Sequence, residues 1–337
     1  MIELHVFRGA AGEREVEWIV DLYGPADPKY LDARFVRHQF AENPFGWSVH
    51  AFALADGRAV GHCALLPVPA RSGDETLVSG KFEAFAVRSE HQSSALPDGR
   101  LVGLALLSEL YDRAAESGFA VLHDLVGPDI GLMHRLHGAS RVQVPWQTLV
   151  GAGNRQMLAS LGGGHVVAAS LVAATQRSLV RTARLASPPA VVRSVDPGDA
   201  PPPAHVLEPG RWTLEAADMW EWLVATGLLA WLEEPSGGRG LVRVPGVARQ
   251  AAELLDWRPG RRPLAGALAA VAAMARLGRE GRSVRIGNPT GDPDLRRAAR
   301  MLGLLPARKP LTLYVKSLQP GLDASGVAVT PFFFATF

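Results

Sequence analysis

Cysteine is almost absent from this 337-residue sequence, which contains Cys63 alone. A single thiol cannot form a disulfide within the chain and cannot build a metal site from several thiolates. A disulfide-stabilised secreted fold is therefore excluded, and the composition favours a reducing compartment. The first residues also lack the basic segment and the apolar run of a secretion signal. We expect a cytoplasmic protein that holds no metal.

Neither sign of charge is in excess, because 35 Lys and Arg residues face 33 Asp and Glu residues, a formal net charge of +2. This balance gives no extended field to hold nucleic acid or an anionic membrane. A long apolar run is missing too, since the Ala-rich stretch 264–274 is shorter than the ~20 residues that cross a bilayer. We expect a small-molecule partner, no nucleic acid, no membrane, and a monomer or homodimer.

Hydrophobic residues, in contrast, make up 47% of the chain, enough for two compact cores at this length. The proline clusters at 188–189 and 201–203 favour extended chain and indicate a junction. We expect one domain over residues 1–150, a connecting segment with a Pro-rich linker over 151–210, and a second domain over 211–337.

The pattern of the first half predicts an α/β fold of the α+β kind, with a mixed, mainly antiparallel sheet flanked by helices. A β-type run on each side of Asp56-Gly57 predicts a tight hairpin. Leucines at helical spacing follow Gly99, and Gly118 is a typical C-terminal cap. Strands are expected at 2–7, 47–54, 59–66, 77–88, 119–126 and 142–150, and helices at 13–23, 29–40, 101–117 and 130–136.

The second half repeats this order coarsely. A helix at 263–277, a strand at 283–287, a helix at 293–301 and then Gly303 follow the same order as residues 101–138, and strands are expected at 311–316 and 327–334. Almost no side chains match between the halves. Duplication of one unit is the interpretation we favour, and two unrelated α/β units are the alternative.

Glycines open the helix near residue 101. A helix N-terminus offers free N–H groups and a positive dipole end, which suit a diphosphate. Gly99 and Gly103 permit close approach of the backbone, and Arg100 can add a charge-assisted bond. Ordinary turn chemistry is the alternative interpretation of this glycine pair.

Residues 1–150 resemble the GCN5-related N-acetyltransferase (GNAT) superfamily. The strand that ends in Glu83-Ala-Phe-Ala-Val87, the loop after it and the leucine-rich helix carry the likeness. Where the family has a basic residue and a middle glycine, this chain has Asp98 and Leu101, whereas the last small residue, Gly103, is kept. The resemblance implies an acyl-CoA-dependent N-acyltransferase of tandem type, with acetyl-CoA or another acyl-CoA as co-substrate. It places that co-substrate on Phe85, Ala86, Val87, Arg88, Gly99, Arg100, Leu101, Val102, Gly103 and Leu104, with the backbone of Ala86, Val87 and Arg88 along the pantetheine arm.

The resemblance also implies the catalytic residues. His134 falls where the family has a tyrosine that protonates the departing thiolate, and Gly127 falls at the family's asparagine. A histidine suits this step because its ordinary pKa is about 6.5; the alternative is a surface histidine of an amphipathic helix. Glu83 matches the family's base, and strict strand alternation places it on one face with Phe85 and Val87. Its alternative role is an ion pair with Lys81 or Arg88.

The second half carries Ala299 at the position that matches His134, and prolines lie in the loop before its helix, so we expect a degenerate copy. The favoured function is transfer of an acetyl or short acyl group to a primary amine of a small molecule, amino-acid-like or a natural-product intermediate. Two alternatives are a noncatalytic binding or sensor protein and an aminoacyl-tRNA-dependent transferase. The near-zero net charge argues against the RNA donor.

Overall fold

The computed structural model describes most of the chain. The described residues are 2–24, 28–126, 128–142, 149–150, 166–186, 189–202, 211–214, 217–244, 252–277, 284–286, 292–306 and 312–327. The chain forms two compact units. The first comprises Met1–Gln143, Ala204–Trp222 and Thr312–Ala328, and the second comprises Val144–Pro203, Leu223–Leu311 and Val329–Phe337.

The first unit contains an eight-stranded mixed sheet with the order β1-β2-β3-β4-β5-β15-β6, and β9 pairs with β3. Only the β4–β5 pair is parallel among these ladders. The predicted fold class is confirmed. The strands are β1 (Ile2–Gly9), β2 (Ser48–Ala55), β3 (Arg58–Ser72), β4 (Glu75–Val87), β5 (Val121–Val126), β6 (Ser140–Val142), β9 (Trp212–Leu214) and β15 (Thr312–Ser317).

The contiguous domain boundaries expected at 150 and 210 are corrected by this sheet. β15 comes from the last part of the chain, yet it pairs with β5 along Val121–Val126 and also with β6. β9, likewise from the second half, extends the ladder of β3. Strand pairing depends on register in space, and composition along the chain carries no sign of it.

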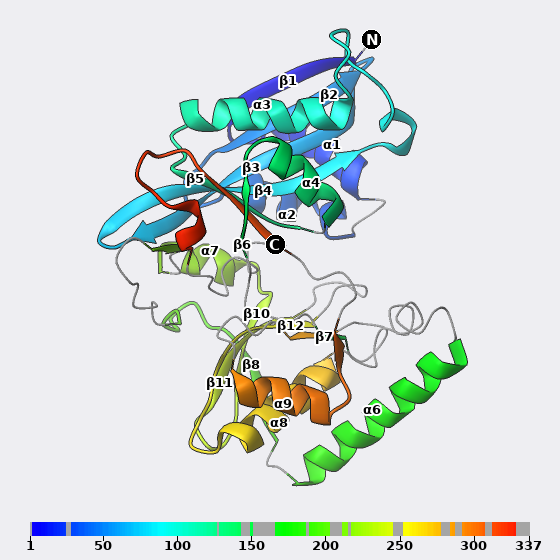
Figure 1. The fold of residues 1–337 in the computed structure, drawn as a ribbon, viewed down its shortest axis with the longest axis vertical. Helices are drawn as coiled ribbons and strands as arrows, with labels where there is room; N and C mark the ends of the chain where they lie inside the picture. Colours follow the sequence, from blue (N-terminus) through cyan, green and yellow to red (C-terminus); the bar gives the residue numbers. More distant parts are fainter. Residues whose placement is uncertain are drawn as a thin grey trace. The chain divides into compact units, whose positions relative to one another are not determined.

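Helices cover both faces of the first sheet (Figure 1). α3 (Val102–Glu116) packs on one face, where Leu106 and Leu110 are fully buried. α1 (Glu13–Tyr23), η1 (Pro28–Leu31) and α2 (Ala33–Phe40) pack on the other with Ile19 and Phe40. Burial of one such side chain contributes about 1.5–3 kcal/mol. α4 (Pro128–Leu136) follows β5, and η2 (Ser89–His91) and η4 (Ala324–Gly326) are single turns.

The predicted hairpin turn is confirmed. Asp56 and Gly57 have φ values of 49° and 76°, so both take the left-handed conformation that the two-residue turn between β2 and β3 requires. Gly118 ends α3 with φ 85°, the conformation of a glycine C-cap.

The second unit contains a five-stranded sheet with the order β13-β12-β11-β10-β8, in which only β12–β13 is parallel. Its strands are β8 (Val191–Ser194), β10 (Leu229–Glu233), β11 (Arg239–Arg243), β12 (Ala252–Arg258) and β13 (Val284–Ile286), with a separate pair of β7 (Leu149–Val150) and β14 (Leu305–Pro306). The helices are α6 (Val166–Ala186), α8 (Pro263–Leu277) and α9 (Pro293–Met301); η3 (Ala217–Met219) and α7 (Trp220–Ala225) lie where the chain passes between units.

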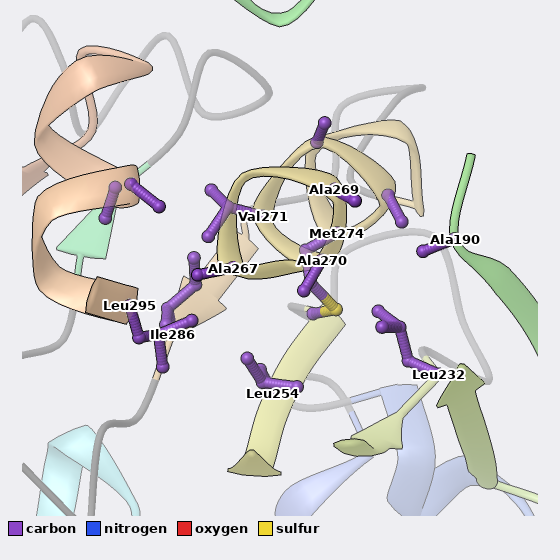
Figure 2. Close-up of a cluster of buried hydrophobic side chains, with 14 of the residues drawn as sticks. Ala190, Leu232, Leu254, Ala267, Ala269, Ala270, Val271, Met274, Ile286 and Leu295 are labelled. Carbon is purple, nitrogen blue, oxygen red and sulfur yellow. The ribbon is translucent and has the colours of Figure 1, made fainter. Parts of the chain in front are cut away.

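α8 is the central element of the second core. In Figure 2, Ala270 and Met274 point toward Leu232 and Leu254 of the sheet. The side chain of alanine is small, so the sheet can pack close to the backbone of α8. Alanine also has the highest helix propensity. The order β12, α8, β13, α9 repeats the order β4, α3, β5, α4, and the strand pair on each side of the helix is parallel in both units. Within the described residues, no helix is both long and apolar enough to cross a membrane.

Candidate active site

β4 and β5 run side by side for three residues and then separate. Their parallel ladder joins residues 79–81 to residues 121–123. β4 continues to Val87, whereas the other edge of β5 is paired with β15 along its whole length. Beyond Lys81, the edge of β4 on the β5 side has no ladder partner among the described residues. An extended ligand can bind the free main-chain groups of such an edge as an added strand.

A β-bulge lies in β4 at this opening. Between two successive pairs of the β3–β4 ladder, β4 has Ala84 and Phe85 where β3 has only Cys63. Ala84 has a φ of 59°, a conformation that residues other than glycine seldom adopt. The extra residue breaks the alternation: Phe85 and Val87 pack beneath α3, whereas Glu83 faces η1. The prediction that Glu83 shares a face with Phe85 and Val87 is therefore wrong.

Tyr23 of α1 holds the bulge. Its hydroxyl donates to the carbonyl oxygen of Ala84 at 2.7 Å and to that of His62 at 2.9 Å. The Nδ1 of His62 lies 3.1 Å from the same hydroxyl, and its Nε2 lies 3.1 Å from Nδ1 of His50. Burial lowers the pKa of His50 to about 3; burial and then His50 lower the pKa of His62, so both rings are neutral at pH 7. The network then assigns each Nδ1–H as a donor, from His50 to His62 and from His62 to Tyr23.

Tyr23→Phe is expected to destabilise the protein by about 1–3 kcal/mol, because the Ala84 carbonyl and the Nδ1–H of His62 both lose a buried partner. Urea unfolding at pH 7 measures this as a lower midpoint with an unchanged slope. Tyr30→Phe is the control: its ring is as buried, but its hydroxyl lies 3.4 Å from Glu83 and does not touch the bulge. Equal losses in the two variants would remove the role of Tyr23.

The N-terminus of α3 presents fewer free donors than the sequence suggested. The helix begins at Val102, but the N–H of Val102 donates to the carbonyl of Ser94 at 3.1 Å. The N–H groups of Gly103 and Leu104 are then the first-turn donors without an intrahelical partner. Together with the helix dipole, these two N–H groups can hold an anion at the end of α3. Leu101, at the N-cap, is half exposed and makes no side-chain cap.

The two arginines predicted at the co-substrate site are paired elsewhere. The Nε of Arg100 lies 2.7 Å from Asp98, and its Nη2 lies 3.3 Å from Glu109. Arg88 donates to Asp21 at 2.7 Å. A charge-assisted bond from Arg100 to a diphosphate therefore requires that its present ion pairs open. Arg88 follows the last residue of β4, and its N–H donates to the carbonyl of Val60 in β3, so this N–H is not free for a pantetheine arm.

Gly103 faces the inner side of the opening. A Cβ built on it would lie 3.4 Å from Phe85, 3.7 Å from Val87 and 4.0 Å from Met133 of α4. These are ordinary contact distances, so a methyl group fits there, and a longer side chain would have to extend into the opening. The structure thus brings together Phe85, Val87 and Gly103, three of the residues that the resemblance assigns to the co-substrate. Because Gly103 has no side chain, the backbone of α3 can also approach a ligand closely.

Asp124, His134 and Tyr111 form one hydrogen-bonded row beside the opening. His134 Nε2 lies 2.8 Å from Asp124 Oδ2, and its Nδ1 lies 2.8 Å from the Tyr111 hydroxyl. The side chain of His134 is 1% exposed and that of Asp124 is 13% exposed. Burial raises the pKa of Asp124 despite the opposing effects of His134 and Lys81. Burial and then Asp124 raise the pKa of Tyr111.

This row changes the interpretation of His134. The alternative of a surface histidine is wrong, because the ring is buried and stacks edge-on against Phe82. Both of its nitrogens are occupied, so any proton exchanged with a ligand passes through the more exposed Asp124. Neither Asp124 nor Tyr111 is among the site residues that the sequence predicts. A carboxylate in the mostly apolar strand 121–126 was the available signal, since a buried charge needs a partner or a function.

Glu83 lies in a cluster of cations on the opposite face of β4. Its Oε2 accepts from Lys81 Nζ at 2.6 Å, its Oε1 lies 3.9 Å from Lys29 Nζ, and the Tyr30 hydroxyl donates to it at 3.4 Å. The predicted alternative, an ion pair with Lys81, is thus present, whereas Arg88 takes no part. Glu83 is thus held by an ion pair and a hydrogen bond on the face of β4 that lies away from α3.

Two other expectations concern this region. Gly127, placed at the family's asparagine, lies outside the described residues, as do residues 143–148 and the predicted strand beyond 327. Within the described part of the chain, no three His, Cys, Asp or Glu side chains gather in a way that would hold a metal ion.

No family model and no curated protein matches the sequence. Solved structures do match it. A putative acetyltransferase from Pyrococcus horikoshii is 10% identical, with a TM-score of 0.53 over 95% of this chain and 92% of that one. A tandem GNAT protein from the clavulanic acid biosynthesis pathway is 15% identical, with a TM-score of 0.51 over 94% of this chain and 99% of that one. Likeness at such low identity shows the fold.

Proposed function

We propose that this chain, which has the tandem fold of the GNAT superfamily, is an acyl-CoA-dependent N-acyltransferase. It moves an acetyl or other short acyl group to the primary amine of a small molecule that is amino-acid-like or a natural-product intermediate. The observation that carries the proposal is the separation of β4 from β5 at a bulge, with Asp124 at the opening.

The residues around the opening fit an acyl-CoA. The unpaired edge of β4 from Phe85 to Val87 offers N–H and C=O groups to the pantetheine amides, and Gly103 and Leu104 offer two N–H groups to the diphosphate. When bound, the thioester supplies an activated acyl carbon. The β4 edge fixes the position of that carbon, and a strand N–H near the bulge can polarise its carbonyl; positioning of this kind is a large part of the acceleration of such reactions.

Asp124 moves the proton in this proposal. As the C–N bond forms, Asp124 accepts the proton that the amine loses, and it returns this proton to the sulfur when the C–S bond breaks. A carboxylate with a raised pKa suits both transfers near neutral pH. His134 is then a positioning residue: it holds Asp124 and is itself held by Tyr111. The role of Glu83 as the base remains a prediction.

A noncatalytic binding module is the second candidate, and one observation favours it. Arg100 forms ion pairs with Asp98 and Glu109, and the N–H of Val102 donates to Ser94. Some of the donors that would bind a diphosphate at the start of α3 are therefore already bonded within the chain. A module of this kind would keep the fold and the opening but would not catalyse acyl transfer.

Incubation of the full chain with acetyl-CoA and a pool of primary amines tests the choice. We expect release of free thiol that depends on the amine pool, with a product whose mass exceeds that of one amine by an acetyl group. Hydrolysis alone, seen as thiol release without the amines, is the background to subtract. Binding of acetyl-CoA with no product from amino acids, polyamines or amino sugars would favour the noncatalytic module.

A further inference from the structure

Glu234 is a buried carboxylate in the turn between β10 and β11 of the second unit. Only 8% of it is exposed. It accepts hydrogen bonds from the N–H of Ser236 at 2.8 Å, from the N–H of Gly238 at 2.7 Å and from the Ser236 hydroxyl. Among the described residues, no Lys or Arg forms an ion pair with it. Main-chain dipoles and one hydroxyl hold this charge.

Three glycines make room for this carboxylate at the start of α8. A Cβ on Gly238, Gly260 or Gly266 would lie 2.7, 2.6 or 2.9 Å from Glu234 Oε1, closer than real Cβ atoms approach other atoms. Gly260 lies in the loop before α8, and Gly266 lies in the first turn of the helix. Glu234 Oε1 therefore sits directly against the N-terminal end of α8.

The turn that carries Glu234 is also bound to the loop before α8. The N–H of Arg261 donates to the carbonyl of Ser236 at 3.0 Å, and the N–H of Arg262 donates to the Ser236 hydroxyl at 3.3 Å. Two main-chain donors of the loop before the helix, those of Arg261 and Arg262, are thus taken by Ser236. No such contact is available to the corresponding turn of the first unit, where Asp56 and Gly57 are both exposed.

The charge at this position is favourable. Burial raises the pKa of Glu234, but the Ser236 hydroxyl and the N–H groups of Ser236 and Gly238 outweigh burial, and the pKa is lowered overall. Glu234 is therefore ionised at neutral pH, next to the positive end of a helix dipole. A second anion at this end of α8 would meet a like charge.

We propose that Glu234 is the built-in anion of the second unit. It fills and neutralises the end of α8, the position that corresponds to the α3 site of the first unit, so each chain takes one acyl-CoA and takes it in the first unit. The stoichiometry rests on the proposed function, whereas the role of Glu234 at α8 does not.

Calorimetric titration of the full chain with CoA tests the stoichiometry. One CoA per chain is expected, and two per chain would overturn the proposal. If none binds, the proposed function fails, and the state of α8 is decided by the two experiments that follow, which use no CoA.

Hydrogen exchange of residues 259–266 tests occupancy of α8 directly, with inorganic phosphate as the probe. In Glu234→Ala the end of α8 loses the carboxylate that lies against it, and we expect phosphate to slow exchange in this segment several-fold; in the wild type we expect no change. Glu233→Ala is the matched control, because the neighbouring Glu233 is 44% exposed and pairs with Arg193 and Arg239 instead. Phosphate protection of the wild type, or none in Glu234→Ala, would overturn the proposal.

Glu234→Gln covers the case in which the alanine variant does not fold, and it isolates the charge. Because the folded-state pKa is lowered, the stabilisation is present above the unfolded pKa of about 4.3 and is lost as the pH falls through the folded value. The thermal midpoint of Glu234→Gln should therefore be lower than that of the wild type at pH 7, and the gap should close toward pH 3. A gap that is independent of pH, or no larger than that of Glu233→Gln, would contradict the role of the charge.

Discussion

Asp124→Asn is expected to lower kcat for acyl transfer by about 10²- to 10⁴-fold, the usual contribution of a positioned acid or base. The amide has nearly the size of the carboxyl and can still bond to His134, so the opening between β4 and β5 should keep its shape. The affinity for acyl-CoA should therefore change little. Steady-state kinetics with a separate measurement of CoA binding distinguishes these two effects.

The pH dependence provides a second test of Asp124. Only the ionised carboxylate accepts a proton, and the pKa of Asp124 is raised by burial. In the wild type, kcat should therefore fall as the pH drops through this raised pKa. In Asp124→Asn this part of the profile should vanish, so that only the titration of the acceptor amine remains. An acidic limb that persists unchanged in the variant would assign the proton transfer to another group.

Glu83→Gln is the matched comparison, since it makes the same carboxyl-to-amide change on the other face of β4. Glu83 is bound by Lys81 at 2.6 Å, and we expect this variant to lower kcat less than Asp124→Asn does. If Glu83 is instead the base that the resemblance implies, Glu83→Gln should be harmful mainly at lower pH, where the amine is protonated. A larger loss in Glu83→Gln than in Asp124→Asn would restore Glu83 as the base.

Stability separates a catalytic from a structural role for Asp124. Its folded-state pKa lies above the unfolded value, so the ionised form carries a free-energy cost of folding at neutral pH. Removal of the charge removes this cost, and the thermal midpoint of Asp124→Asn should stay level or rise at pH 7. Lower activity together with equal or higher stability is typical of a functional residue.

The order of helices and strands was largely predictable because it depends on local patterns. Leucine spacing located α3, and Asp56-Gly57 located the β2–β3 turn, since each rests on the geometry of a few neighbouring residues. The pairing of β15 with β5 was not predictable in this way. That pairing joins a strand of the first half of the chain to one near its end, and the sequence of neither strand identifies its partner.

The site was predicted less well, for two physical reasons. The bulge at Ala84 shifts every later side chain of β4 by one position, so strict alternation placed Glu83 on the wrong face. Roles predicted for one residue at a time also missed side chains that are linked by hydrogen bonds, such as the row of Asp124, His134 and Tyr111. His134 was found through its position in a motif, but its two hydrogen bonds decide what it can do.

Gly103→Arg is expected to abolish the stabilisation of the protein by CoA. A ligand at 100 times its dissociation constant stabilises the folded chain by about 2.7 kcal/mol, which corresponds to several degrees in the thermal midpoint. A Cβ at Gly103 already lies 3.4 Å from Phe85, so the rest of an arginine side chain must extend into the opening that the proposed pantetheine and diphosphate occupy. Thermal unfolding with and without CoA measures the loss.

Gly103→Ala separates the blocked site from a damaged helix. Its methyl group fits at contact distance from Phe85 and Val87, and alanine favours the helix by about 1 kcal/mol over glycine. This variant should be as stable as the wild type without ligand and should keep the CoA shift, whereas Gly103→Arg should fold and lose it. If Gly103→Arg folds and CoA still raises its thermal midpoint as much as in the wild type, CoA binds elsewhere. In that case the end of α3 would be an ordinary helix start, and the fold would remain without the cofactor site.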